Sequence, residues 1–269
     1  MSLLPEQRSQ ENSYELLSST RVDTLLPTLG WNNDHAGPSS FILLPYHLDR
    51  LRDAAEQHGW THARRTLTYD AIKSACQVAL ADRDDQTASD AFKVRITLAE
   101  SGTLSVSLAP TSNFTADPTA AAFFSPISDN ASLFGPVLPV YIDSEPTPTS
   151  LFTSTKTTHR TVYNDARLRV GLSLSPASFA ASDVLLYNPQ GLITETSIFN
   201  VAFHRSLQWV TPPASTGCLP GVLRRWLLEQ GRIQEDKDKI LTKDSVQEGD
   251  WVLLFNGVQG CRLGRITKM

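Results

Sequence analysis

The sequence has little of what marks several common classes of protein. Its three cysteines, Cys76, Cys218 and Cys261, are odd in number and widely spaced, so they predict neither a disulfide framework nor a zinc cluster. The 24 lysines and arginines do not exceed the 28 aspartates and glutamates, which argues against a nucleic-acid-binding surface. No apolar run approaches the roughly 18 residues of a membrane-spanning helix. We therefore expect neither nucleic acid nor a membrane as a partner.

Motifs of several reaction types are also missing. The sequence contains no P-loop, no GxGxxG after a strand, no HExxH and no GxSxG. Its six histidines show no metal-ligand spacing, so no metal site is predicted. Residues 1–17 reach polar side chains too early for a secretory signal and hold a single arginine, which is too few for a transit peptide. With 41% hydrophobic and 19% charged residues, we expect a soluble cytoplasmic protein.

Hydrophobic patterning divides the chain into two halves. Residues 1–142 predict an α+β domain; its expected strands are 14–22, 93–99, 104–108 and 137–142, and its expected helices are 46–55 and 69–80. Residues 143–155 are polar, with Pro146 and Pro148, and are typical of an exposed interdomain connection. In residues 156–269 we expect helices at 160–169 and 222–230 and a buried strand at 251–255. We also expect two strand pairs, 184–188 with 192–195 and 200–203 with 208–211.

Five short motifs follow one another along the chain. They are HLDRL at 47–51, KTTHR at 156–160, TETS at 194–197 with an asparagine at 200, LPGVLR at 219–224 and FNGVQG at 255–260. In this order and spacing they resemble the fold-type IV family of pyridoxal-phosphate enzymes, from about Tyr14 to Arg265. The resemblance implies an α+β, two-domain fold like that of D-amino acid aminotransferase, with a small N-terminal α/β sandwich and a larger C-terminal β-barrel-like domain. It also implies a homodimer.

The cofactor that the resemblance implies is pyridoxal 5'-phosphate. This cofactor needs a lysine that forms a Schiff base, a carboxylate near its pyridine nitrogen and a cradle for its phosphate. By the resemblance, Lys156 is the Schiff-base lysine, Glu195 faces the pyridine nitrogen and Arg50 contacts the phosphate. Without the resemblance, these three residues are equally a surface lysine, a strand-end carboxylate and a solvated helix arginine.

Two further motifs match the family's phosphate cradle. Val222 and Leu223 stand at a helix start, where backbone N–H groups hold the phosphate. Leu223 replaces a common threonine, so one hydroxyl contact is lost while the backbone N–H groups remain. Asn256, Gly257 and Val258 match a second phosphate-binding turn, again without a hydroxyl at Gly257. An ordinary Asn-Gly hairpin turn is the alternative for this segment.

Other polar residues are expected to support the cofactor or to bind the substrate. Ser197 is expected near the cofactor ring and Asn200 on the neighbouring backbone, although a purely structural role for either stays open. Arg95, His159 and Arg160 are candidates to bind substrate carboxylates, and Arg160 is equally a structural arginine at a helix start.

Within the family, the segments at 14–21, 44–50, 156–160, 208–213 and 253–260 resemble the fungal type of 4-amino-4-deoxychorismate lyase. That reaction, a step of folate biosynthesis, yields 4-aminobenzoate and pyruvate. The resemblance implies that the freed Lys156 amine takes the C4 proton while Glu195 keeps the pyridine nitrogen protonated. The substrate carries two carboxylates, which is why cationic residues are expected around it.

Two alternative functions remain open. An aminotransferase acting on D-amino acids, branched-chain amino acids or amines shares every cofactor residue, and it would depend on a second keto acid. A non-catalytic family member is favoured only by the two missing hydroxyls at Leu223 and Gly257, and the presence of Lys156 and Glu195 argues against it.

Overall fold

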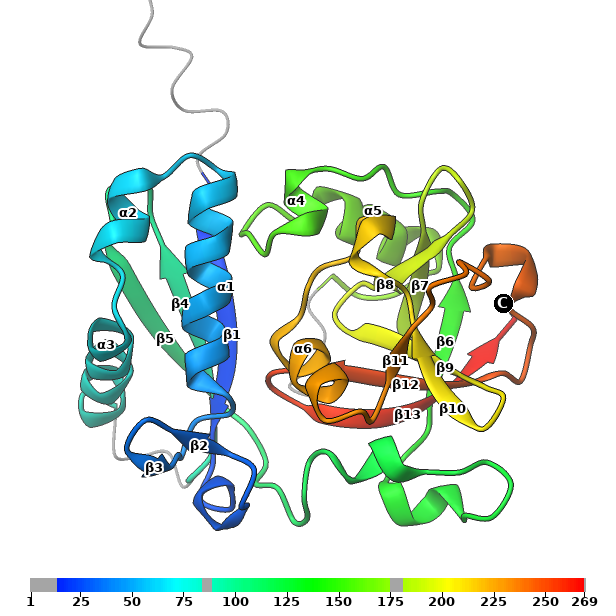
Figure 1. Cartoon of the computed structure of the whole chain (residues 1–269), viewed down its shortest axis with the longest axis horizontal. Helices are drawn as coiled ribbons and strands as arrows, with labels where there is room; N and C mark the ends of the chain where they lie inside the picture. Colours follow the sequence, from blue (N-terminus) through cyan, green and yellow to red (C-terminus); the bar gives the residue numbers. More distant parts are fainter. Residues whose placement is uncertain (1–13, 84–88, 175–180, 269) are drawn as a thin grey trace, which may run out of the picture.

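The computed structural model describes residues 14–83, 89–174 and 181–268. Figure 1 shows two units, a small sheet with its helices and a larger curled sheet. The small antiparallel sheet has the order β1-β4-β5 and consists of β1 (Leu16–Val22), β4 (Phe92–Leu98) and β5 (Leu104–Pro110). A separate two-stranded ribbon pairs β2 (Asn33–Asp34) with β3 (Gly37–Pro38).

Helices cover one face of the small sheet. They are α1 (Leu44–Gln57), α2 (Thr61–Thr66) and α3 (Tyr69–Ala81). The buried stripe of α1 recurs every three or four residues, as an amphipathic helix requires, at Leu44, Leu48, Leu51 and Ala55. It packs in one core with Val94 and Ile96 of β4. The Thr68 hydroxyl caps α3 by accepting from the Ala71 N–H at 3.1 Å.

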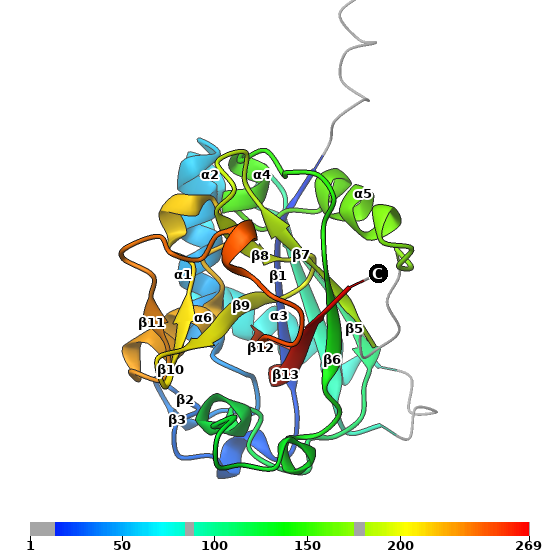
Figure 2. The ribbon, with the colours of Figure 1, turned by 90° about the vertical axis from the view of Figure 1, so that its right-hand side faces the viewer.

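The larger sheet has eight strands in the order β11-β10-β9-β12-β13-β6-β7-β8. They are β6 (Leu138–Ile142), β7 (Asp183–Tyr187), β8 (Ile193–Thr196), β9 (Asn200–Arg205), β10 (Gln208–Thr211), β11 (Gln234–Glu235), β12 (Trp251–Asn256) and β13 (Gly260–Thr267). The four central residues of β12 are fully buried, because separate hydrophobic cores lie on the two faces of this sheet. Figure 2 shows the sheet from the side, curling into a half-barrel.

Short helices surround the larger sheet. They are α4 (Leu151–Ser154), α5 (Thr161–Arg169) and α6 (Val222–Glu229), with 3-10 turns at Leu26–Thr28, Ala120–Phe123, Ala131–Phe134, Ala214–Thr216 and Lys243–Ser245. α6 buries Leu223, Trp226 and Leu227 against Leu253 and Phe255 of β12. In the part of the chain that the structure describes, no helix has the length and apolar character needed to cross a membrane.

The expected α+β fold and its helices and strands are confirmed, with one correction to the division of the chain. The strand at 138–142, expected in the small domain, is β6 of the larger sheet, where it lies parallel to both β13 and β7. The segment 143–155, expected as an exposed interdomain connection, therefore follows a strand of the larger sheet. Most of it is exposed, as expected, whereas Asp143 and Thr147 are buried and their N–H groups donate to Leu185 O and Tyr187 O. Polar composition predicted the exposure of the segment but not the sheet that its preceding strand joins, because strand partners depend on the packing of the whole chain.

Candidate active site

One cavity of about 390 Å³ lies between the small and the larger sheet. Leu17, Ser19, Lys93 and Arg95 line it from the small sheet. The lining includes every site residue expected from the sequence except Leu223: Arg50, Arg95, Lys156, His159, Arg160, Glu195, Ser197, Asn200, Val222, Asn256, Gly257 and Val258. This size suits a cofactor or small substrate. The fold therefore brings together residues spread over more than two hundred positions of sequence.

Lys156 follows α4 and is held by backbone pairing to the small sheet. Its carbonyl oxygen accepts from the Leu17 N–H at 2.8 Å, and the next residue, Thr157, bridges to Leu16. Burial, together with the positive charges of Arg160 and Arg50, lowers the pKa of the Lys156 amine. A neutral amine is the form that acts as nucleophile or base, so the cavity prepares Lys156 for that chemistry.

Glu195 lies at the end of β8 and is almost completely buried. Its Oε1 accepts from the Tyr163 hydroxyl at 2.9 Å and from the Leu219 N–H at 3.3 Å. Burial raises the pKa of the Glu195 carboxyl, while Tyr163 and Lys156 act in the opposite direction. The pKa of Tyr163 is raised well above its ordinary value by burial and by Glu195, so this hydroxyl remains a donor. Two fixed donors thus orient the carboxylate within the cavity.

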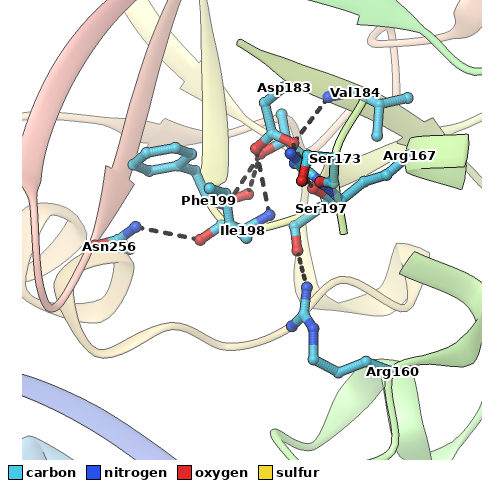
Figure 3. Close-up of polar contacts among 10 residues, drawn as sticks. Arg160, Arg167, Ser173, Asp183, Val184, Ser197, Ile198, Phe199 and Asn256 are labelled. Carbon is cyan, nitrogen blue, oxygen red and sulfur yellow. Dashed lines mark hydrogen bonds and ion pairs between the residues drawn. The ribbon is translucent and has the colours of Figure 1, made fainter. Parts of the chain in front are cut away.

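A buried network fixes the turn after Glu195 (Figure 3). Asp183 accepts from Arg167 Nη1 at 3.2 Å and from the Ser197 hydroxyl. Arg167 Nη1 also donates to Ser197 Oγ at 2.9 Å. The Ser197 hydroxyl, expected beside the cofactor ring, is therefore engaged by Asp183 and Arg167. The carbonyl of Ser197 accepts from Arg160 Nη2 at 2.7 Å, so the network also holds the Arg160 guanidinium.

The start of α6 offers unused backbone donors. The Arg225 N–H donates to the Gly221 carbonyl and is the first N–H of the helix with a helical acceptor. No side chain caps the helix start, so the N–H groups before Arg225 remain available. A Cβ on Gly221 would overlap Asn200 Oδ1, so this position requires glycine. Asn200 Nδ2 donates to the Leu219 carbonyl at 2.8 Å and holds the segment in place. The Leu223 side chain points into the core, so only its N–H can contribute to the site.

Arg50 and the β12–β13 turn complete a pocket suited to an anion. Arg50 Nη2 donates to Ser18 Oγ at 2.7 Å, and its buried Nε has no partner among the described residues. Asn256 Oδ1 accepts from the N–H groups of Val258 (2.9 Å) and Gln259 (2.8 Å), so the Val258 N–H, expected in the cradle, is used within the turn. A free guanidinium N–H beside an uncapped helix start fits the phosphate of the expected cofactor.

Cationic side chains of the small sheet also line the cavity. Lys93 and Arg95 are two residues apart on β4 and therefore share a face. No described carboxylate forms a salt bridge with either of them or with Arg160. Burial and the charges of Arg95 and Arg160 lower the pKa of Lys93. Lys93 was not among the residues expected from the sequence, although its two-residue spacing from Arg95 would have identified it.

β1 carries three consecutive hydroxyl side chains at 18–20, and they do not all face the site. Ser19 lines the cavity, whereas Ser18 and Thr20 are fully buried on the other face of β1. Ser18 Oγ contacts His47 Nδ1 and Thr20 Oγ1 donates to the Ile42 carbonyl. The alternation of a strand explains the difference.

Comparison with known proteins gives a consistent result. Residues 25–265 match the model of the family described as amino-transferase class IV. Over 217 residues, 80% of this chain and 80% of the relative, the sequence is 34% identical to a Schizosaccharomyces pombe protein provisionally named an aminodeoxychorismate lyase. It is 40% identical to the aminodeoxychorismate lyase of Saccharomyces cerevisiae over 139 residues, which are 47% of this chain and 36% of that protein.

Solved structures share the fold. A protein of Mycobacterium tuberculosis described as a hypothetical aminotransferase, with alpha-ketoglutarate and PMP bound, superposes with a TM-score of 0.60 at 17% identity. That match covers 100% of this chain and 89% of the other. A protein of Mesorhizobium loti provisionally described as an amino-acid aminotransferase gives a TM-score of 0.63 at 23% identity, over 94% of this chain and 100% of the other.

Proposed function

The chain belongs to the class IV aminotransferase family, whose members are pyridoxal-phosphate-dependent enzymes, and from that membership we propose that it is a lyase that converts 4-amino-4-deoxychorismate to 4-aminobenzoate and pyruvate. Two relatives that carry this lyase name support the proposal. One observation carries the proposal: Lys93, Arg95 and Arg160, which have no salt-bridge partner among the described residues, line the same cavity as Lys156.

The same cavity supports pyridoxal 5'-phosphate as the cofactor. Lys156 and Glu195 line this cavity and would supply the covalent anchor and the partner for the ring nitrogen, and Arg50 with the Val222 and Leu223 N–H groups would hold the phosphate. When bound, this cofactor supplies an electron sink for the carbon that loses its proton.

Lys156 and Glu195 carry the proton transfers and the charge balance in this proposal. The lowered pKa of Lys156 makes its amine available to accept the proton from C4 of the substrate. Glu195, whose Oε1 is held by Tyr163 and Leu219, would be the carboxyl partner of the ring nitrogen. As the C4–H bond and the ether C–O bond break, the ring becomes aromatic and the departing enolpyruvate takes up a proton to form pyruvate. The Lys156 ammonium formed by the first transfer holds the proton that pyruvate takes up, and Ser19, the hydroxyl of the 18–20 run that lines the cavity, would relay it.

The charge of the cavity favours a dicarboxylate substrate. Glu195 is the single acidic residue of its described lining, whereas Arg50, Lys93, Arg95, Lys156, Arg160 and Arg167 are cationic. Arg167 is neutralised by Asp183 and Arg50 is assigned to the phosphate. Lys93, Arg95 and Arg160 remain for two carboxylates, and charge-assisted hydrogen bonds of this kind are strong and specific. An aliphatic amino acid has a single carboxylate and would leave part of this positive charge without a salt-bridge partner.

An aminotransferase remains the second candidate function, because the solved structures of the same fold include proteins described as aminotransferases. It would use the same Lys156 and Glu195 and would require a keto acid as second substrate.

One assay separates the two functions. We would incubate the purified protein, loaded with pyridoxal 5'-phosphate, with aminodeoxychorismate and quantify 4-aminobenzoate and pyruvate, with Lys156→Ala as control. Equal amounts of both products without added keto acid, lost in the control, support the lyase. Turnover only with a keto acid and an amino donor would contradict the lyase and support the aminotransferase.

We also propose that the protein is a homodimer, as the family resemblance implies. Light scattering on the purified protein should give twice the chain mass of 29.6 kDa, and a mass of 29.6 kDa would contradict the proposal.

A further inference from the structure

Gly257 lies in the turn between β12 and β13, and its backbone does not explain why it is glycine. Its φ lies outside the left-handed region that favours glycine. A Cβ at this position would lie 3.0 Å from both Cε1 and Nε2 of His47 and 3.0 Å from Cγ2 of Val222. These distances are tighter than nine in ten real Cβ contacts, so a neighbouring side chain would have to shift by a few tenths of an ångström. The imidazole of His47, which reaches across from the small domain, thus borders the space that a side chain at 257 would need.

The Ser18 hydroxyl links the imidazole of His47 to the Arg50 guanidinium. Arg50 Nη2 donates to Ser18 Oγ at 2.7 Å, so the single Ser18 proton is free to point at His47 Nδ1, also 2.7 Å away. His47 is completely buried, and burial with the charges of Arg50 and Lys156 lowers its pKa well below the ordinary value, so the ring is neutral. Nε2 has no hydrogen-bond partner among the described residues, and its edge of the ring borders Gly257.

We propose that His47 is a positioning residue for the phosphate-binding turn, and that it sets this turn relative to Arg50. The imidazole edge packs on Gly257, and Ser18 ties the same imidazole to the Arg50 guanidinium. The proposed phosphate pocket has one part on α1 and another on the β12–β13 turn. His47 thus fixes the distance between these two parts across the two domains. This inference rests on the proposed cofactor but is independent of which reaction the enzyme catalyses.

The consequence is a specific coupling between positions 47 and 257. A serine at 257 introduces a hydroxyl, yet it should weaken phosphate binding because its Cβ displaces the imidazole. Shrinking His47 should relieve that displacement. The two substitutions should therefore be non-additive, as expected for residues in contact.

The experiment measures dissociation constants of two probes on the apoprotein by tryptophan fluorescence. Pyridoxal 5'-phosphate reports on the whole site, and pyridoxal, which lacks the phosphate, reports on everything except the phosphate pocket. We expect Gly257→Ser and His47→Ala each to weaken pyridoxal 5'-phosphate binding by about tenfold, the size typical of overpacking or lost packing. The double variant should bind more tightly than Gly257→Ser alone, and pyridoxal binding should change less than about twofold.

Four results would overturn the inference. Additive losses would show that positions 47 and 257 are not coupled, and equal losses for both probes would show a merely structural effect. If Gly257→Ser does not fold by circular dichroism, Ser18→Ala tests the tie to Arg50 instead, and an unchanged affinity for pyridoxal 5'-phosphate would contradict the proposal. A wild-type protein that does not bind pyridoxal 5'-phosphate would refute the proposed cofactor, and this inference with it. If the wild-type protein binds pyridoxal 5'-phosphate but has no lyase activity, the proposed reaction is wrong and the inference about His47 still holds.

Discussion

The Leu17 N–H donates to the Lys156 carbonyl oxygen at 2.8 Å, so the proposed Schiff-base lysine of the larger domain is paired to the edge strand of the smaller one. Thr157 continues this pairing through its bridge to Leu16, and the Thr158 N–H donates to the Glu15 carbonyl. The position of the Lys156 amine relative to Ser19 and Arg95 is therefore determined by hydrogen-bond register between the two units.

Stability of the apoprotein should depend on pH through Lys156. The pKa of this amine is lowered in the folded state and is near 10.5 when unfolded, so between these values the unfolded chain binds more protons. Stability therefore rises with pH across that window, by up to about 1.4 kcal/mol per pH unit. Urea unfolding of wild type and Lys156→Met between pH 7 and 10 measures the difference. Identical slopes for the two proteins would contradict the lowered pKa.

Substitution of Arg95 by glutamine should raise KM for aminodeoxychorismate by about ten- to a hundredfold. This is the change expected when one or two charge-assisted hydrogen bonds to the substrate are lost. Affinity for pyridoxal 5'-phosphate should stay unchanged, because Arg95 lies on the small sheet, away from the α6 start. Arg64→Gln is the matched control, since that arginine forms an exposed ion pair with Glu56. An unchanged KM would remove Arg95 from the substrate site.

Replacement of Tyr163 by phenylalanine removes one of the two donors to Glu195 Oε1. Because that hydrogen bond lowers the pKa of Glu195, its loss should raise this pKa and reduce kcat by about tenfold, with KM little changed. Steady-state kinetics across pH would record both effects. Tyr187→Phe serves as control, since Tyr187 donates to the Ser144 carbonyl outside the cavity lining. Equal kcat in both variants would exclude a role for Tyr163.

Removal of the charge at Asp183 should destabilise the fold strongly. Asp183→Asn leaves the buried Arg167 guanidinium without its ion-pair partner, at a cost of about 3–5 kcal/mol. Arg167→Met in the same chain should recover part of the loss, because it removes the unpaired charge. Denaturant unfolding gives both values. A loss below about 1 kcal/mol, as for an exposed pair, would show that the network is not needed for folding.

The sequence predicted the local elements well, and it selected residues that the structure brings into one cavity. The helix beginning after Thr68 and the hairpin of β4 and β5 follow from capping and from two-residue alternation, which depend on neighbours only a few positions away. The order of the five motifs was enough to select Arg50, Lys156 and Glu195, which the structure places in one cavity.

What the sequence by itself determined is thus the set of elements, the family and the residue types at the site. Only the tertiary structure decided that β6 joins the larger sheet, that Ser19 rather than Ser18 faces the cavity, and that His47 fills the space beside Gly257. The physical reason is the range of the interactions. Helix and strand patterns arise from short-range backbone preferences, whereas strand partners and contacts between distant side chains depend on which surfaces pack together when the whole chain folds.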